Sequence, residues 1–335
     1  MAKVLVSGAT GMVGAHVCLR LSRAGHQVVA MRRSSSEVTW MERIFAFNQL
    51  NMQEHVVFCE ADLLDISSLQ EALKDIDVVV HCAAKVSFFP ADNEALFLHN
   101  HQGTANLVNV CLDFPRIHFI HISSVAALGN PEQEMINEQT RWKSYPYASP
   151  YSITKYMAEM EVWRGGEEGL KINILQPSYI LGQGNWYTGS ASLFRQVKKG
   201  LNYYTTATMG FVYVRDVAEA VLSCIEKKKF GESYIINAEN KTYREILLAI
   251  AQFGNLPQPA KQLNRKTLRF ILPALKLIFW LRGKRLPLNK FVMASIFQSK
   301  FYDNKKSRDE LGINYTPIDD CIKDSWAFFK HYFPN

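Results

Sequence analysis

Hydrophobic residues along this chain gather into short, nearly continuous runs that alternate with segments of helical periodicity. The first run, KVLVSG at residues 3–8, is followed by a helical pattern from Met12 to Ala24. Further apolar, β-branched runs follow, most of them separated by helical stretches, at residues 26–31, 56–61, 76–84, 117–123 and 171–177. Because continuous apolar runs are typical of strands buried on both faces, the pattern predicts an α/β fold with a doubly wound parallel sheet.

The regular alternation ends near residue 177. Residues 210–227 predict a short strand and a helix, residues 233–238 predict another strand, and the rest of the chain is mainly helical, basic and aromatic. We therefore expect a sheet domain and a smaller, mainly helical lobe at its C-terminal side. The sheet domain is predicted to comprise residues 1–177 and 210–238, and the lobe residues 178–209 and 239–335.

The composition, with 48% hydrophobic and 21% charged residues, is that of a folded protein. The net charge of +7 is spread along the chain without a nucleic-acid-binding motif, so we expect no nucleic-acid partner. The six cysteines are scattered and show no metal-binding spacing, and the chain opens directly on a strand pattern. These features predict a cytoplasmic location and no bound metal.

Three glycines lie between the first predicted strand and the first predicted helix, in the segment SGATGMVG at residues 7–14. Glycine allows a tight turn and a close approach of the backbone to a pyrophosphate, and the helix that follows offers unpaired N–H groups to phosphate oxygens. This arrangement predicts a dinucleotide-binding site. Its predicted contact residues are Gly8, Thr10, Gly11, Met12, Val13 and Gly14.

The second predicted strand ends in MRRSSS at residues 31–36. Sites that prefer NAD(H) usually offer a carboxylate there for the ribose 2′-hydroxyl, whereas the guanidinium groups of Arg32 and Arg33 can bind a 2′-phosphate. We therefore expect NADP(H) to be preferred over NAD(H). Further cofactor contacts are expected after the third and fourth strands, namely Asp62 and Leu63 at the adenine and Ala83, Ala84 and Lys85 beside the cofactor.

Two serines, a tyrosine and a lysine form a second constellation. The strand at 117–123 carries Ser123 and Ser124 to its carboxyl end, and Tyr151 precedes Lys155 by four residues, so a helix stacks these two side chains on one face. A lysine ammonium near a phenol stabilises the phenolate and lowers the Tyr pKa from ~10. The constellation predicts a proton-transfer site, with Tyr151 and Lys155 also contacting the nicotinamide half of the cofactor.

Together these motifs resemble the extended short-chain dehydrogenase/reductase family over at least residues 3–237. The matching segments are GATGMVG, ADLLD, VVHCAA, NHQGTANLV, HISSVAALG, YSITK, LQPSYILGQGN and FVYVRDVAEAV. The resemblance implies that Tyr151 is the catalytic acid/base and that Lys155 activates it and binds the nicotinamide ribose. It also implies that Ser124 is the active-site hydroxyl, with Ser123 as the alternative.

The same resemblance implies that Pro177 and Ser178 lie beside the nicotinamide. Family members often form dimers through the helices that carry the Tyr–Lys segment, so a homodimer is expected. Within the family, PSYILGQGN is similar to dihydroflavonol-4-reductase-like and 3β-hydroxysteroid-dehydrogenase-like members. The stretch before VYVRDVA lacks the Gln and Arg that many nucleotide-sugar members carry.

These features favour an NADP(H)-dependent oxidoreductase that reduces a ketone or aldehyde by hydride transfer. Two alternatives are a nucleotide-sugar epimerase or dehydratase, and a non-catalytic protein that senses dinucleotides. Aromatic residues near the predicted site favour an apolar or ring-bearing carbonyl substrate. The predicted substrate residues are Phe88, Tyr145, Tyr179 and Trp186.

Residues 268–285, LRFILPALKLIFWLRGKR, form the most apolar segment of the predicted lobe. Its apolar part is too short to span a bilayer, which takes ~20 residues. It is predicted either to touch a membrane surface through its flanking basic residues, or to serve as a lid or packing helix.

Overall fold

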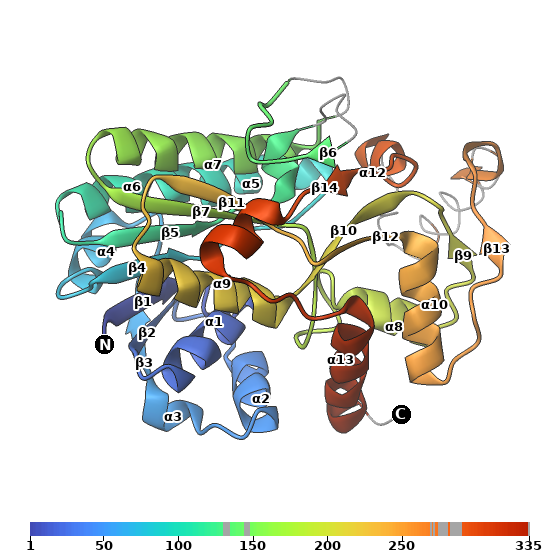
Figure 1. Ribbon diagram of the computed structural model, residues 1–335, viewed down its shortest axis with the longest axis horizontal. Coiled ribbons are helices and arrows are strands. Elements are labelled where there is room, and N and C mark those ends of the chain that lie inside the picture. The colour runs from blue at the N-terminus through green and yellow to red at the C-terminus, as the bar shows by residue number, and fades with distance from the viewer. Residues whose placement is uncertain are drawn as a thin grey trace.

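The computed structural model describes residues 1–129, 135–143, 148–268 and 290–333, together with residues 270, 272, 273 and 281. Its larger part is built on a seven-stranded sheet with the strand order β11-β7-β5-β4-β1-β2-β3, in which every neighbouring pair is parallel (Figure 1). The strands are β1 (Lys3–Ser7), β2 (Gln27–Arg32), β3 (Val56–Glu60), β4 (Val78–His81), β5 (His118–Ile122), β7 (Lys171–Pro177) and β11 (Glu232–Ile236). The predicted doubly wound α/β fold is confirmed.

Helices cover both faces of this sheet (Figure 1). Val4 and Val6 of β1 share one hydrophobic core with α1, α2 and α9, whereas Leu5 belongs to a second core with α4, α6 and α7. This division follows from the strand geometry, because successive side chains point to opposite faces. The helices are α1 (Met12–Arg23), α2 (Thr39–Phe47), α4 (Ile66–Ala72), α6 (Gly103–Leu112), α7 (Pro150–Glu167) and α9 (Val214–Lys227), with the short elements α3 (Met52–His55), α5 (Asn93–Leu96), η1 (Pro90–Asp92), η2 (Phe97–Gln102) and η3 (Val125–Leu128).

The order of the strands determines where a ligand can bind. The chain winds outward from β1 to β2 and β3, and then returns to β4 on the other side of β1. Connections on the two sides of this reversal leave the sheet in opposite directions, which opens a crevice beyond the carboxyl ends of β1 and β4. The predicted glycine segment follows β1, so it lies at this crevice.

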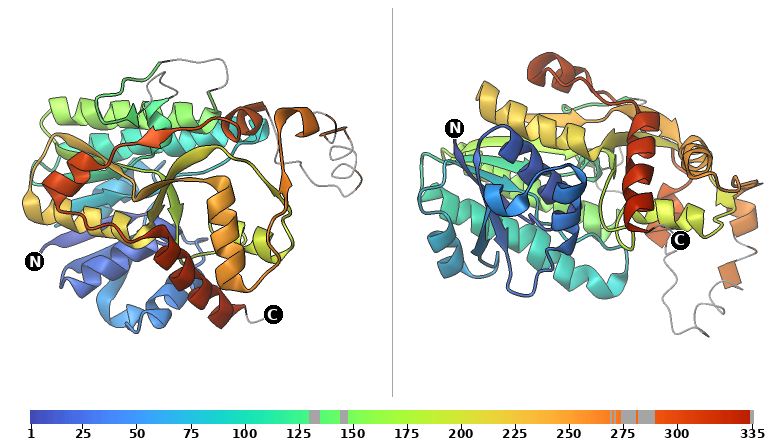
Figure 2. Two further views of the ribbon diagram at one scale, coloured as in Figure 1. Left: turned by 45° about the vertical axis from the view of Figure 1, so that its right-hand side comes forward. Right: turned by 90° about the horizontal axis from the view of Figure 1, so that it is seen from below.

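The smaller lobe lies beside the carboxyl ends of the strands (Figures 1 and 2). In the described residues it contains a three-stranded sheet in the order β12-β10-β8, two short strand pairs, β13 with β9 and β14 with β6, and several helices. The elements are β6 (Met135–Ile136), β8 (Tyr179–Leu181), β9 (Tyr203–Tyr204), β10 (Thr208–Tyr213), β12 (Glu239–Thr242), β13 (Lys261–Gln262), β14 (Phe301–Tyr302), α8 (Ser192–Lys198), α10 (Tyr243–Gly254), α12 (Lys290–Ser295), η4 (Ser307–Leu311) and α13 (Ile318–Tyr332).

The second sheet differs from the sequence-based expectation in one respect. Residues 210–238 were predicted as one block of the larger domain, but β10 pairs with β8 and β12, while α9 and β11 return to the main sheet. The apolar run of β10 predicts a buried strand without indicating its partners. β12 is the polar stretch ENKT, so no hydrophobic alternation marks it.

No helix in the described part of the chain is long and apolar enough to cross a membrane. Most of the segment 268–285, for which contact with a membrane surface was an alternative, lies outside the described residues.

A polar network joins the lobe to the main sheet domain. Asp324 of α13 accepts hydrogen bonds from the Tyr213 hydroxyl, from Gln183 Nε2 at 2.6 Å and from Arg215 Nη2 at 3.3 Å. Gln183 Oε1 in turn accepts a hydrogen bond from Asn48, just beyond α2, at 2.9 Å. One carboxylate thus links α13 to β10, to the start of α9 and, through Gln183, to α2.

We expect Asp324→Ala to lower the free energy of unfolding by about 2–3 kcal/mol, because hydrogen bonds to a charged group contribute ~1.5–3 kcal/mol and three donors lose their acceptor. Urea unfolding measures the change. Asp319→Ala is the matched control on the same helix, since Asp319 is exposed and pairs with Lys241 at the surface. Equal, small effects of the two substitutions would show that the network does not hold the lobe.

Candidate active site

The turn between β1 and α1 can be built only with glycines at two of its positions. Gly8 has a φ of +65°, and a Cβ on it would lie 2.7 Å from the backbone of Ala83 at the end of β4. A Cβ on Gly14 would lie 2.2 Å from the carbonyl oxygen of Gly8. Gly11 caps α1 without a side-chain hydrogen bond, and there is no acidic residue in the first turn. The N-terminus of α1 therefore presents its backbone N–H groups without a competing side chain.

A cavity of about 520 Å³ opens at this turn, beyond the carboxyl ends of β1, β2 and β4. Its volume lies within the usual range of small-molecule sites. It brings together most of the predicted cofactor residues from four separate segments. They are Gly8, Thr10, Gly11, Arg32, Arg33, Asp62, Leu63, Ala83, Ala84 and Lys85, which line it with Ser7, Met31, Ser36, Ala61, Cys82 and His99. Met12, Val13 and Gly14 belong to the first turn of α1 just behind this wall.

The end of the cavity beyond β2 is basic. Arg32 lies over the ring of Phe58, with 4.9 Å from its guanidinium carbon to the ring centroid, and its Nη1 is 3.4 Å from the carbonyl oxygen of Ser36. Arg33 is exposed, and its backbone N–H donates to the Ser36 hydroxyl at 3.2 Å. The serine thus closes a short turn that keeps both arginines at the rim.

Across the cavity, the carboxylate of Asp62 accepts the backbone N–H of Leu64 at 3.0 Å and thereby shapes the loop after β3. The Leu63 side chain is 8% exposed and packs closely against Gly103. A Cβ added to Gly103 would lie only 3.1 Å from the Leu63 Cβ. Both residues lie on the wall on which an adenine was predicted.

The sequence analysis did not identify Asn100, which fixes the loop after β4. Its Oδ1 accepts the backbone N–H of Lys85 at 2.7 Å, and its Nδ2 donates to the Lys85 carbonyl at 2.9 Å and to the Thr154 hydroxyl at 3.2 Å. Asn100 lies in the π-helical turn η2 and is 1% exposed. It belongs to the segment NHQGTANLV, which was matched only as a family motif, so the signal was present without an assigned role.

The serine, tyrosine and lysine predicted from separate segments converge in space. Ser124 follows β5, and its hydroxyl is hydrogen-bonded to the phenol of Tyr151 in the first turn of α7. That helix starts where it does because Ser149 caps it, accepting the N–H of Ser152 at 3.0 Å, and because Pro150 occupies its first position. One turn further on, Lys155 is 2% exposed, and its Nζ donates to the Ile122 carbonyl at 2.9 Å.

The three groups adjoin the cavity through β4 and its following loop. Cys82, which lines the cavity, is close enough to Lys155 for the lysine charge to affect the pKa of the Cys82 thiol, although burial dominates and raises that pKa to about 12. The ring of Phe88, beyond Lys85 in the same loop, meets the Tyr151 ring edge-on at a centroid distance of 6.1 Å.

One electrostatic expectation is wrong in this structure. Lys155 was expected to keep the pKa of Tyr151 low, but burial raises the pKa of Tyr151, and only the hydrogen bond from Ser124 opposes the increase. The phenol therefore holds its proton at neutral pH and is a proton donor. Burial also lowers the pKa of Lys155, to about 8, because an ammonium loses its hydration in the interior.

The predicted substrate residues in the described part of the chain do not form one wall. Phe88 is 40% exposed beside Tyr151, as a substrate contact requires. Tyr179 packs edge-on against Phe211 of β10 and Tyr243 of α10. Tyr145 lies outside the described residues.

Trp186 has a packing role in the lobe. Its indole is 5% exposed and stacks on Phe333 at a centroid distance of 4.1 Å and on Phe329 at 5.4 Å. An aromatic residue in a loop was interpreted as a pocket residue, but the tertiary structure uses its area to anchor α13.

Pro177 and Ser178 lie at the carboxyl end of β7, where the chain passes from the main sheet to the lobe. Both are buried, and the Ser178 N–H donates to the Ile236 carbonyl at 3.0 Å. Their predicted position beside a nicotinamide is compatible with this place at the crevice, but their contact with the ring stays a prediction.

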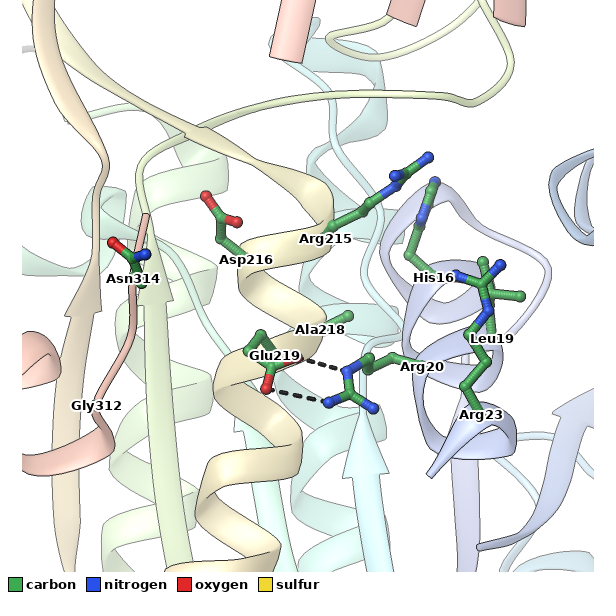
Figure 3. Close-up of a pocket in the computed structure, with 10 residues that line it drawn as sticks. All are labelled: His16, Leu19, Arg20, Arg23, Arg215, Asp216, Ala218, Glu219, Gly312 and Asn314. Atoms are coloured by element: carbon green, nitrogen blue, oxygen red, sulfur yellow. Dashed lines mark hydrogen bonds and ion pairs between the residues drawn. The ribbon is translucent and has the colours of Figure 1, made fainter. Parts of the chain in front are cut away.

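A second cavity, of about 410 Å³, lies between α1 and α9 (Figure 3). Figure 3 shows Arg20 reaching from α1 to Glu219 on α9, with two hydrogen bonds of 2.5 and 3.2 Å. Arg215 is similarly bound to Asp324. Among the described residues that line this cavity are none of the predicted site residues, and its cationic side chains are largely neutralised by carboxylates. Most of the predicted cofactor residues line the first cavity instead.

The first cavity fits a nicotinamide dinucleotide. The two glycine positions leave space that any Cβ would fill, the N-terminus of α1 faces that space, and the basic rim and the Tyr–Lys pair lie at separate parts of the crevice. The described residues contain no cluster of metal-ligating side chains.

Comparison with known proteins gives the same class. Residues 4–238 match the NAD dependent epimerase/dehydratase family, and the chain belongs to this family of extended short-chain dehydrogenases/reductases. The predicted family membership is thus confirmed, and with it a nicotinamide dinucleotide as the expected cofactor.

Individual relatives are distant. The chain is 26% identical to "Sterol demethylase protein B" of Methylococcus capsulatus over 97% of this chain and 98% of that protein. It is 27% identical to the "Putative dihydroflavonol 4-reductase" of Synechocystis sp. over 98% of this chain and 94% of that protein. Among solved structures, the crystal structure of gox2253 superimposes with a TM-score of 0.82 and 27% identity, covering 99% of both chains.

Proposed function

We propose that this protein is an NADP(H)-dependent reductase of a ketone or aldehyde. The observation that carries the proposal is the convergence of Ser124, Tyr151 and Lys155 next to the cavity that begins at the glycine turn. Two relatives are named after ring-bearing compounds, a sterol and a dihydroflavonol, and the second is named as a putative reductase, which supports a ring-bearing substrate.

The reduced nicotinamide, when bound, supplies the hydride for the carbonyl carbon. Ser124 and Tyr151 donate hydrogen bonds to the carbonyl oxygen, and Tyr151 gives its proton to that oxygen as negative charge develops. The raised pKa of Tyr151 suits this direction, because the phenol is protonated before the step. Lys155, an ammonium below pH about 8, then stabilises the phenolate that remains. Reprotonation of the phenolate from solvent completes the cycle.

A panel of ketones and aldehydes, monitored by NADPH absorbance, tests the proposal. Net oxidation of NADPH that depends on the carbonyl compound supports it. An epimerase or dehydratase, which the family also contains, would convert a nucleotide sugar without net consumption of the cofactor. A sensor would bind the dinucleotide without either reaction, but the complete Ser–Tyr–Lys set disfavours that alternative.

The choice of NADP(H) rests on the arginines at the end of β2. We expect NADP⁺ to raise the unfolding temperature more than NAD⁺, because a ligand at 100 times its Kd adds ~2.7 kcal/mol to the free energy of unfolding. Arg32→Ala should reduce the shift with NADP⁺ and leave that with NAD⁺ nearly unchanged. The matched control is Arg116→Ala, whose guanidinium pairs with Asp75 far from the cavity. A larger shift with NAD⁺ in the native protein would contradict the preference.

A further inference from the structure

One helical turn of α7 beyond the Tyr–Lys pair lies a buried carboxyl group that the proposed reaction does not use. Glu159 stands one turn after Lys155 on the same face of α7 and is 4% exposed. Its Oε1 accepts a hydrogen bond from the Ser123 hydroxyl, and Gln176 Nε2 donates to its two oxygens at 3.0 and 3.1 Å. Burying a carboxyl group is costly unless it is paired, so its place here calls for a function.

The hydrogen-bonding pattern indicates an ionised carboxylate. An ionised carboxylate can only accept hydrogen bonds, and both of its partners, Ser123 directly after β5 and Gln176 of β7, donate to it. Burial raises the pKa of Glu159, while the hydrogen bonds from Ser123 and Gln176 and the charge of Lys155 act in the opposite direction. The Oε1 of Gln176 has no partner among the described residues, which follows from the amide turning its N–H groups toward Glu159.

The other titratable groups around Lys155 are neutral. His121 lies 3.4 Å from Lys155 Nζ, and burial holds the pKa of His121 well below its usual value. Burial likewise lowers the pKa of His81 to about 3 and raises the pKa of Cys82 to about 12. The phenol of Tyr151 keeps its proton. Among these groups, Glu159 alone can carry the negative charge that opposes the Lys155 ammonium.

Glu159 and Lys155 also form hydrogen bonds with two consecutive residues at the carboxyl end of β5. Lys155 donates to the carbonyl of Ile122 and Glu159 accepts from the side chain of Ser123, directly before Ser124. Two groups on one face of α7 thus fix the backbone from which the Ser124 hydroxyl reaches Tyr151.

We propose that Glu159 is a positioning residue for the Tyr–Lys pair: its buried carboxylate keeps Lys155 protonated and, through Ser123, holds the end of β5 that presents Ser124. The part of this inference that concerns turnover rests on the proposed function, whereas the charge of Lys155 can be measured without any substrate. Turnover should then fall with rising pH as Lys155 loses its proton, and the charge of Glu159 determines the pH at which this happens.

The test is Glu159→Gln, which keeps the shape and removes the charge. The new amide can still accept from Ser123, and Gln176 can rotate its unpartnered oxygen toward the new N–H group, so the variant has partners for its polar atoms. The pH titration of Lys155 is followed by NMR of isotope-labelled lysine, with the signal assigned from its absence in Lys155→Arg. We expect a midpoint near pH 8 in the native protein and roughly one unit lower in Glu159→Gln, since the charge of Glu159 raises the pKa of Lys155 and a nearby opposite charge shifts a pKa by about 1–3 units.

Turnover gives a second measurement. At pH 8 the kcat/KM of Glu159→Gln should be roughly five times lower than that of the native protein, and at pH 6 the two should agree, which follows from a shift of about one pKa unit. Glu159→Asp retains the charge but shortens the reach to Ser123, so it should keep the native alkaline limit while lowering kcat. Glu161→Gln is the control on the same helix, because Glu161 is partly exposed and pairs with Arg164, and it should leave both profiles unchanged.

A folded Glu159→Gln whose Lys155 titrates as in the native protein would overturn the inference. If the native protein reduces no carbonyl compound but Lys155 shifts as expected, the proposed substrate class fails and the electrostatic role of Glu159 stands. An equal shift in Glu161→Gln would show that the effect is not specific to the buried carboxylate and would also overturn the inference.

Discussion

Tyr151→Phe is expected to lower kcat/KM for carbonyl reduction by ~10²–10⁴, the usual contribution of a general acid. The phenylalanine ring keeps the edge-on contact with Phe88, while the hydroxyl that is hydrogen-bonded to Ser124 is removed. Dinucleotide binding should be almost unchanged, because the glycine turn and the basic rim are built from other segments. The loss of one hydrogen bond should change the free energy of unfolding by only about 1 kcal/mol.

Steady-state kinetics with NADPH, fluorescence titration with NADP⁺ and urea unfolding separate these effects. Tyr156→Phe is the control: it removes a hydroxyl from the same helix at a ring that stacks on Trp142, and turnover should be retained. Full activity of Tyr151→Phe would disprove the assigned acid. An equal loss of cofactor affinity and of kcat/KM would mean that Tyr151 acts through binding alone.

Gly14→Ala is expected to lower the free energy of unfolding by about 3 kcal/mol, the upper part of the range for overpacking, and to abolish dinucleotide binding. Helix propensity alone predicts the opposite sign, since alanine is favoured over glycine by about 1 kcal/mol inside a helix. The difference arises because the new Cβ would lie 2.2 Å from the Gly8 carbonyl oxygen and 2.7 Å from Ala9 Cα, which are backbone atoms that cannot rotate away. The N-terminus of α1 has to move, and with it the N–H groups expected to bind phosphate.

Gly11→Ala is the matched control in the same turn. Its Cβ would meet only the Gly8 oxygen, at 3.3 Å, and Gly11 has a φ of −78°, which alanine adopts readily. We expect a loss below about 1 kcal/mol for this ordinary tight contact. Urea unfolding and NADP⁺ titration of both variants provide the comparison. Equal stability of Gly14→Ala and the native protein would contradict the packing argument.

The apolar runs predicted all seven strands of the main sheet, most of them to within two residues at each end, although the run at 76–84 extended beyond β4 (Val78–His81). The predicted run at 56–61 is β3 (Val56–Glu60), and that at 171–177 is β7 (Lys171–Pro177). β7 lies inside the sheet and is buried along most of its length, so its apolar run identifies it without knowledge of its neighbours. β3 is an edge strand with Val57 67% exposed, and its β-branched composition is what marks it. The pattern failed where burial comes from a partner that lies far along the chain. β10 was predicted as part of the main sheet domain but pairs with β8 and β12. Trp186 was predicted as a substrate residue but stacks on Phe333.

The features of the candidate active site also fall into two groups, those that the sequence predicts and those that only the tertiary structure shows. By itself, the sequence determined the glycine turn, the basic end of β2 and the four-residue spacing of Tyr151 and Lys155, because each depends on local backbone geometry. Only the tertiary structure decided that Asn100 holds the Lys85 loop, that burial raises the pKa of Tyr151, and that Glu159 lies against Ser123 and Gln176. Those outcomes depend on desolvation and on contacts between residues 15 to 36 positions apart or on different strands, and local periodicity carries no information about either.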